Sequence, residues 1–276
     1  MVQLIVDQLL AYGIRKVVVS PGSRNASFSI AFDEHPEIET FVVHDERSAG
    51  FIALGMAQEL GETIALCCTS GSACLNYYPA VSEAFYRSIP LLVLTADRPA
   101  VWINHGDGQT IVQRDVYKNH IMGSLEMDED VFDQKSIEQH QEDLAHLLAI
   151  TTSNWKGPIH LNVGLNEPLY QTVEKTVNYG KILALGKATN RMDASNMEVI
   201  VQEINQSKVL ILCGQMTQDL KVQQELIKLA SFPNVVVLVE NTSNLQHERF
   251  IHCIDRTLNG FDQKNEVYQQ VSIGFA

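Results

Sequence analysis

Four consecutive polar residues, His44 to Arg47, stand between a strand-like run and a helix-like run. The run before them, Thr40 to Val43, is β-branched and aromatic, and small or apolar residues recur at helical spacing after Ser48. The pattern predicts a strand, a short turn that carries Glu46, and a helix that begins at Ser48 and ends at Gly61. A carboxylate at the carboxyl end of a strand lies where open α/β sheets bind ligands, which makes Glu46 a candidate for acid–base chemistry.

On position alone, Glu46 has a simpler interpretation. A glutamate at the start of a helix commonly interacts with the helix dipole, and Arg47 could pair with it. Three further strand-like runs favour a functional role for Glu46 over this simpler one. Each run ends in a polar turn, and the carboxyl ends of parallel strands meet at one edge of a sheet. The guanidinium groups in two of these turns suit a carboxylate or a phosphate. The three runs with their turns are residues 16–19 with Ser20 to Arg24, residues 63–68 with Thr69 to Gly71, and residues 90–95 with Asp97 and Arg98.

Composition narrows the classes of function. The chain has 276 residues and a net charge of −13, without a run of Lys or Arg, so nucleic acids and anionic membrane surfaces are not expected as partners. Its apolar runs are too short to cross a bilayer and no signal peptide opens the chain, which predicts a cytoplasmic protein. The 5 cysteines lack C-x-x-C spacing and are expected to be reduced thiols, not metal ligands.

The order of strands and helices predicts an α/β fold, a parallel sheet flanked by helices, over residues 1–170. Residues 100–125 lack periodicity, and an irregular glycine-bearing segment of this length is often functional. Residues 171–192 are expected to form a linker. A second α/β unit, residues 193–276, contains only two clear strands, which predicts a truncated domain.

Several ordered motifs resemble those of one enzyme family. The order strand, Glu, helix, strand, Thr-Ser-Gly, helix, strand resembles the pyrimidine-binding domain of thiamine-diphosphate enzymes. Within that family, the motifs look like those of the 2-succinyl-5-enolpyruvyl-6-hydroxy-3-cyclohexene-1-carboxylate synthases of menaquinone biosynthesis. The resemblance covers residues 1–170 well and continues more weakly to about residue 255. The motifs are Ser20 to Arg24, Asp45 to Phe51, Thr69 to Gly71, Tyr78 to Ala80, Leu94 to Pro99 and Gln109 to Ile111.

The resemblance implies a role for each candidate residue. Glu46 would be catalytic, because in such enzymes a carboxylate hydrogen-bonds the aminopyrimidine ring of the cofactor. It implies that the cofactor contacts Pro21, Glu46, Thr69, Ser70, Gly71 and Asn76. It also implies that isochorismate, which carries two carboxylates, is bound by Ser23, Arg24, Arg98 and Gln109.

The resemblance further implies the reaction and the assembly. The transferase would decarboxylate 2-oxoglutarate on thiamine diphosphate and add the four-carbon carbanion equivalent to isochorismate. The family's chains have about twice this length. A truncated Rossmann-like middle domain would follow the pyrimidine-binding domain, and the diphosphate-binding domain with the Mg²⁺ ligands would be absent. Because full-length family members share the cofactor across a homodimer or within a homotetramer, this amino-terminal fragment is expected to be inactive alone. Gly106-Asp107-Gly108 is not expected to bind metal, since no strand leads into it.

Other readings differ in what the residues would bind. Acetolactate synthases and 2-oxoacid decarboxylases use the same cofactor, but they typically show His-Glu and Gly-Pro-Gly where this chain has Asp45-Glu46 and Gly71-Ser72-Ala73. A non-catalytic α/β module that binds a dicarboxylate would not need Glu46. A nucleotide-binding Rossmann enzyme is disfavoured because no G-x-G-x-x-G turn follows any strand.

Overall fold

The computed structural model describes residues 1–128, 134–153, 156–167, 170 and 193–258. The chain divides into two compact units, residues 1–189 and 190–276, which are described separately below. The predicted linker, residues 171–192, lies outside the described residues, as does the end of the chain after residue 258.

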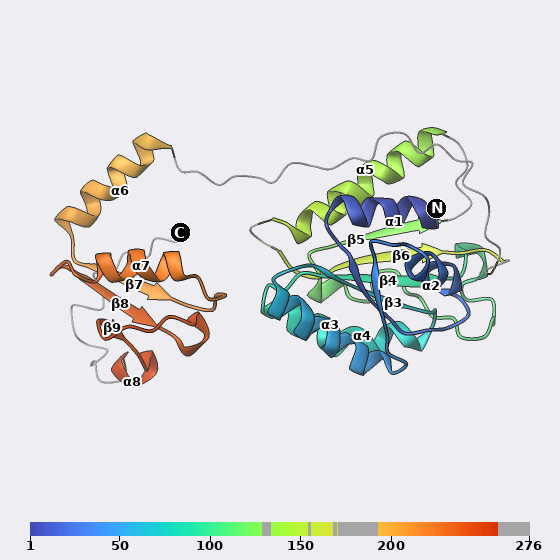
Figure 1. Cartoon of the computed structure of the whole chain (residues 1–276), viewed down its shortest axis with the longest axis horizontal. Coiled ribbons are helices and arrows are strands. Elements are labelled where there is room, and N and C mark those ends of the chain that lie inside the picture. Colours follow the sequence, from blue (N-terminus) through green and yellow to red (C-terminus); the bar gives the residue numbers. More distant parts are fainter. Residues whose placement is uncertain (129–133, 154–155, 168–169, 171–192, 259–276) are drawn as a thin grey trace. The chain divides into compact units, whose positions relative to one another are not determined.

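The first unit is built on a six-stranded parallel sheet in the order β2-β1-β3-β4-β6-β5. Strands β3 and β6 are buried along their whole length, as continuous apolar runs in a parallel sheet should be. The predicted fold class is therefore confirmed for this unit (Figure 1). The strands are β1 (Lys16–Val19), β2 (Glu39–Val42), β3 (Ile64–Cys68), β4 (Leu91–Asp97), β5 (Gly123–Asp128) and β6 (Ile159–Gly164).

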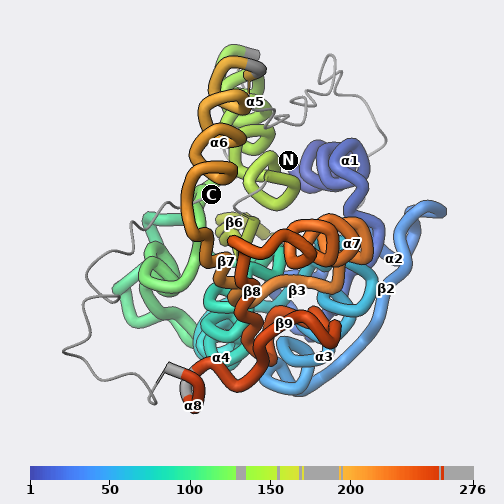
Figure 2. The backbone as a smooth tube through the Cα atoms, turned by 90° about the vertical axis from the view of Figure 1, so that its left-hand side faces the viewer, coloured from blue at the N-terminus to red at the C-terminus, as the bar shows by residue number. Residues whose placement is uncertain are grey.

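Helices cover both faces of this sheet (Figures 1 and 2). Because successive side chains of a strand point to opposite faces, Val17 and Val19 of β1 belong to one apolar core and Val18 belongs to the other. One face carries α1 (Val2–Ala11), α2 (Ala26–Asp33) and α5 (Gln134–Thr151), and the other carries α3 (Glu46–Leu60) and α4 (Ser72–Tyr86).

The start of α3 differs from the sequence-based expectation. Asp45, and not Ser48, is the N-cap, and its carboxylate accepts a hydrogen bond of 2.7 Å from the Ser48 backbone N–H. Both residue types suit a cap, and the spacing alone could not choose between them. Glu46 is consequently the first residue of the helix, directly after the turn that follows β2. The predicted end at Gly61 is confirmed.

The long connection after β4 contains more regular structure than predicted. Two 3₁₀ turns, Ala100–Trp102 and Lys118–His120, lie within residues 100–125, the segment predicted to be irregular. The strand β5 begins inside that segment and ends just beyond it. Among the described strands, this one pairs with β6 alone and lies at the edge of the sheet. Its sequence, Gly-Ser-Leu-Glu-Met-Asp, has no β-branched residue. An edge strand of this composition gives little periodic signal.

The second unit has a three-stranded parallel sheet in the order β7-β8-β9. Its small core lies between the sheet and α7, with Leu226, Val237 and Phe250 among the buried residues. The two-residue strand β9 was too short to predict from the sequence. The elements are α6 (Ala194–Gln206), β7 (Val209–Cys213), α7 (Leu220–Leu229), β8 (Val235–Val239), a 3₁₀ turn (Asn241–Ser243), β9 (Phe250–Ile251) and α8 (Ile254–Leu258).

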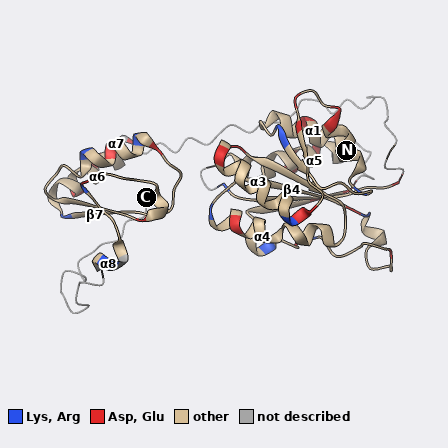
Figure 3. Cartoon of the chain, turned by 60° about the horizontal axis from the view of Figure 1, so that its bottom comes forward, with Lys and Arg blue, Asp and Glu red and all other residues tan. Residues whose placement is uncertain are grey.

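Charged residues are distributed over the elements of each unit, and the basic positions form scattered spots on the ribbon in the view of Figure 3. No helix among the described residues combines the length and the apolar character that a membrane span requires.

Candidate cofactor-binding and substrate-binding site

The strand register brings the predicted polar turns together at one edge of the first sheet. Val19 of β1 lies beside Val42 of β2 on one side and beside Cys67 of β3 on the other. Cys68 in turn lies beside Thr95 of β4. Neighbouring strands are about 4.8 Å apart. The turns that follow β2, β1, β3 and β4 therefore lie one after another, in that order, along the carboxyl edge of the sheet.

Glu46 presents an available carboxylate at this edge. Its side chain is half-buried, and none of the hydrogen bonds or ion pairs found among the described residues uses that carboxylate. Glu46 begins α3, the helix that packs beside α4 on one face of the sheet. A partly desolvated carboxylate without an internal partner can accept a hydrogen bond from a ligand.

The Thr69-Ser70-Gly71 turn requires its glycine. Gly71 has φ +82°, a conformation that side-chain-bearing residues rarely adopt. A Cβ atom there would lie 2.7 Å from the backbone oxygen of Gln109, so only glycine lets the segment around Gln109 approach. Gln109 itself has φ 56°. Unusual backbone conformations at two neighbouring positions are typical of active sites and ligand-binding sites.

Ser70, Arg98 and Gln109 form one hydrogen-bonded cluster. Arg98 Nη1 donates to Ser70 Oγ at 2.7 Å and to the backbone oxygen of Gln109 at 3.1 Å. The Ser70 hydroxyl donates to the same oxygen at 3.2 Å, and Gln109 Nε2 donates to the Ser70 carbonyl at 3.1 Å. Arg98 Nε is paired with the carboxylate of Asp107. The structure thus brings together three residues that were predicted from separate motifs.

Arg24 joins the cluster through the other side of the same turn. Its backbone N–H donates to Thr69 Oγ1 at 3.2 Å, and its Nη1 donates to the Leu165 carbonyl at 3.0 Å. Its Nη2 lies 3.5 Å from the carboxylate of Glu167. Consecutive residues of one turn therefore contact the two candidate arginines.

Three other predicted residues have a looser relation to this cluster. Pro21 and Ser23 lie in the β1–α2 turn and are exposed. Asn76 is exposed on α4, and its side-chain amide donates to the Ser72 carbonyl of its own helix at 3.0 Å. Their contacts to a ligand remain predictions.

A buried polar network beneath the turn was not predicted from the sequence. Gln113 Oε1 accepts from the Gly71 N–H at 2.8 Å, and Gln113 Nε2 donates to Asn162 Oδ1 at 2.8 Å. Asn162 Nδ2 then donates to two carboxylates, Asp97 at 3.0 Å and Glu126 at 2.8 Å. The network ties the turn to β4, β5 and β6. No local motif signals it, because Gln113 lies in a segment without periodicity and Asn162 interrupts an apolar strand.

The network continues to His160. The Thr95 hydroxyl donates to Asn162 Oδ1 at 2.6 Å, so His160 Nε2, 2.7 Å away, carries the proton in its hydrogen bond to Thr95. Burial lowers the pKa of His160 to about 3. The imidazole is therefore neutral at physiological pH and acts as a structural donor.

Burial also raises the pKa of Glu126, although the hydrogen bond from Asn162 opposes the shift. Because the folded protein binds this proton more tightly than the unfolded chain, the contribution of Glu126 to stability falls as the pH rises through that raised pKa. We expect Glu126→Gln to be more stable than the wild type at pH 7, and the gap to close below about pH 4, where an ordinary glutamate is protonated. Urea unfolding of both proteins between pH 4 and 7 measures this, and a gap that widened on acidification would contradict it.

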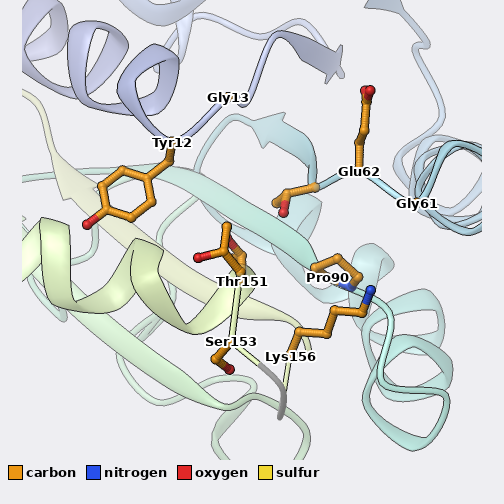
Figure 4. A pocket seen from close by; sticks show the side chains of 10 residues that line it. Tyr12, Gly13, Gly61, Glu62, Pro90, Thr151, Ser153 and Lys156 are labelled. Carbon is orange, nitrogen blue, oxygen red and sulfur yellow. The ribbon is translucent and has the colours of Figure 1, made fainter. Parts of the chain in front are cut away.

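A cavity of about 430 Å³ in the first unit lies at the opposite edge of the sheet (Figure 4). Its lining residues Gly13, Gly61 and Pro90 lie just before or near the amino ends of β1, β3 and β4. It is separate from the cluster at the carboxyl edge. Nowhere in the described part of the chain do three or more His, Cys, Asp or Glu side chains gather as a metal site would require.

The fold and the residues at the carboxyl edge define a class of protein. A family model described as the thiamine pyrophosphate enzyme, N-terminal TPP binding domain, matches residues 1–119. The fold is also similar to that of two solved decarboxylases. Benzoylformate decarboxylase from Polynucleobacter necessarius has a TM-score of 0.63 at 18% identity, over 87% of this chain and 43% of that one. The thiamine diphosphate-dependent 4-hydroxybenzoylformate decarboxylase from Rhodococcus jostii has a TM-score of 0.65 at 14% identity, over 87% of this chain and 44% of that one. Residues 1–119 therefore match the amino-terminal, cofactor-binding domain of the thiamine pyrophosphate enzymes.

Curated relatives narrow the assignment within this class. The chain is 42% identical over 278 residues to the 2-succinyl-5-enolpyruvyl-6-hydroxy-3-cyclohexene-1-carboxylate synthase of Flavobacterium johnsoniae, across 99% of this chain and 49% of the relative. It is 35% identical to the enzyme of that name from Porphyromonas gingivalis, across 99% of this chain and 48% of the relative. The predicted resemblance is confirmed. The chain spans about half the length of the curated relatives it matches.

Proposed function

We propose that this chain provides the part of an enzyme that activates thiamine diphosphate and binds isochorismate. The complete enzyme, a transferase in menaquinone biosynthesis, decarboxylates 2-oxoglutarate and adds the resulting four-carbon unit to isochorismate. The observation that carries the proposal is the half-buried Glu46 carboxylate, which has no hydrogen bond among the described residues and lies at the same carboxyl edge of the sheet as the Ser70–Gly71 turn. Relatives of this name at 35–42% identity support the choice of reaction.

The residues present suit the cofactor. Glu46 is an acceptor for the aminopyrimidine ring, and Gly71, which has no Cβ, leaves room for Gln109 beside the turn. When bound, the cofactor supplies the electron sink for decarboxylation. The chain's own contribution is to hold a proton acceptor at a fixed position and to screen it from part of the solvent, which strengthens its hydrogen bond.

The residues also suit a substrate with two carboxylates. Arg24 follows β1 and Arg98 follows β4, the two strands that flank β3, so the two residues approach the turn after β3 from its two sides. Each presents a planar guanidinium that pairs well with a carboxylate. The Ser70 hydroxyl and the Gln109 main chain fix the Arg98 head, so little side-chain freedom is lost on binding.

The remaining parts belong to the proposal for the complete enzyme. Mg²⁺ and the diphosphate group would be held by a domain outside this chain. A homodimer or a homotetramer in the cytoplasm would bring that domain to the carboxyl edge described above. Isochorismate and 2-oxoglutarate are the small-molecule partners.

The test is turnover with and without the other half of the enzyme. We expect the native-length protein to release carbon dioxide from 2-oxoglutarate only when isochorismate, thiamine diphosphate and Mg²⁺ are all present, and the 276-residue chain alone to be inactive. Turnover of pyruvate in place of 2-oxoglutarate would favour an acetolactate synthase type. Binding of dicarboxylates without any turnover by the folded native-length protein would favour a non-catalytic module.

A further inference from the structure

Each of the two candidate substrate-binding arginines is already paired with a carboxylate of the chain itself. Arg98 pairs with Asp107, and Arg24 pairs with Glu167. In both pairs the basic side chain is nearly buried and the acidic side chain is not. The side chain of Arg98 is 14% exposed against 44% for Asp107, and that of Arg24 is 11% exposed against 74% for Glu167.

The Arg98 head is held mostly by groups that would stay in place. Its Nη1 donates to Ser70 Oγ and to the Gln109 backbone oxygen, both fixed by the turn. Asp107 takes the Nε edge, and its other carboxylate oxygen accepts from the Gly108 N–H at 3.0 Å. That second bond is local, so Asp107 can leave the guanidinium while its loop keeps its conformation.

The Arg24 guanidinium is likewise held by a backbone carbonyl on one nitrogen and by an exposed carboxylate on another. Its Nη1 is anchored on the Leu165 carbonyl at 3.0 Å, and the Leu165 N–H donates to the Asp97 carbonyl, just before Arg98. Glu167 contacts only Nη2, at 3.5 Å, and is the weaker of the two contacts. Removal of Glu167 would leave the anchor intact.

These contacts differ in how much they cost to break. A nearly buried guanidinium without a partner is unfavourable, because it has lost its water and gained nothing in return. An ion pair whose acid is exposed contributes little, so its carboxylate exchanges readily for another. The protein thus keeps two guanidiniums charged, oriented and partnered while no substrate is bound.

We propose that Asp107 and Glu167 are internal surrogate carboxylates that occupy the arginine heads until a dicarboxylate substrate displaces both. This inference rests on the proposed function, since it deepens the substrate site. It makes the two acids specificity-determining residues. A monocarboxylate replaces one surrogate and leaves the other pair unchanged. A dicarboxylate of suitable spacing replaces both, and it binds more tightly because the translational entropy of binding is lost once for two ion pairs.

Isophthalate and benzoate, a ring with two carboxylates and a ring with one, test the proposal on the full 276-residue chain. Titrations followed by the arginine Nε–H resonances in ¹⁵N NMR spectra give the dissociation constants. We expect Asp107→Asn to tighten isophthalate binding by about 1.5- to 5-fold, the range for release of one partly exposed ion pair. Glu167→Gln is expected to act in the same direction, and the double variant to approach the product of the two factors.

The matched control is Asp115→Asn. It removes the same charge from the same connection, but among the described residues the one ion pair of Asp115 is with Lys118, 4.0 Å away on the surface. An equal gain in this control would show a general effect of net charge and would overturn the proposal. Weaker binding in Asp107→Asn would overturn it too, since Asp107 would then position Arg98 for the ligand. The proposal would also be overturned if neither probe shifted the arginine resonances in any of the proteins.

A second readout separates this inference from the proposed function. In the native-length enzyme, Asp107→Asn should lower the KM for isochorismate and leave kcat unchanged, because the surrogate acts on binding alone. If isophthalate binds as expected but the enzyme shows no isochorismate-dependent turnover, the surrogate role of the two acids is retained and the proposed reaction is wrong. If turnover exists and its KM does not respond, the reaction stands and the surrogates fail.

Discussion

Glu46→Gln is expected to reduce isochorismate-dependent turnover of the native-length enzyme by about 10²- to 10⁴-fold, the usual contribution of a positioned acid–base group. The substitution keeps the shape of the side chain and removes its charge. Because the carboxylate makes no hydrogen bond among the described residues, the fold should be unchanged. Release of carbon dioxide from 2-oxoglutarate under saturating cofactor measures the effect.

Glu59→Gln is the matched control, because Glu59 lies on the same helix, α3, and is exposed. Its turnover should equal that of the wild type. If Glu46→Gln retained full turnover, the fold and family assignment would stand, but the role of Glu46 would be wrong.

Gly71→Ala is expected to have the second large effect, on stability and on turnover together. Its Cβ would lie 2.7 Å from the Gln109 backbone oxygen at a φ of +82°, so both the backbone and its neighbour must shift. We expect a loss of about 1–3 kcal/mol in the free energy of unfolding, typical of a non-glycine residue forced into this conformation. Urea unfolding followed by tryptophan fluorescence measures it, since both tryptophans fall within residues 1–189.

Gly55→Ala provides the comparison. Gly55 lies inside α3, and a Cβ there would meet no atom within 4 Å. Replacement of glycine by alanine in a helix interior stabilises by about 0.5–1 kcal/mol, so this variant should shift the unfolding midpoint in the opposite direction. A Gly71→Ala protein as stable as the wild type would show that the approach of Gln109 does not depend on glycine.

The parts of the fold that follow from the sequence are those with a strong local pattern. The strands β1 and β3 are short, apolar and bounded by turn residues, and small and apolar residues recur at helical spacing in α3, which lies between them in the chain. Because parallel strands end at one edge, the proximity of Ser70 and Arg98 could also be inferred before the structure, and their 2.7 Å hydrogen bond confirms it.

The parts that could not be predicted depend on partners far away in the chain. Gln113 meets Gly71 and Asn162 across separations of 42 and 49 residues, and nothing near Gln113 indicates either contact. The edge strand β5 owes its conformation to β6, not to its own residues. Likewise the choice of Asp45 over Ser48 as the N-cap is decided by where the chain leaves β2.

The pairing of each arginine with an exposed acid is a further feature that could be found only in the three-dimensional structure. Asp107 belongs to a Gly-Asp-Gly sequence that looks like a metal-binding motif, yet its carboxylate faces Arg98. A cation already stands beside it, so the local electrostatics favour the ion pair over a metal.

The most direct test of the role of Glu46 is the exchange rate of the thiazolium C2 proton of thiamine diphosphate bound to the native-length enzyme. Quenched exchange into deuterated water, read by proton NMR, compares the wild type with Glu46→Gln at equal cofactor occupancy. We predict fast exchange in the wild type and a rate lower by about 10²- to 10⁴-fold in the variant, in line with the loss of one acid–base group. Equal exchange rates in the two proteins would contradict the assignment of Glu46 as the residue that activates the cofactor.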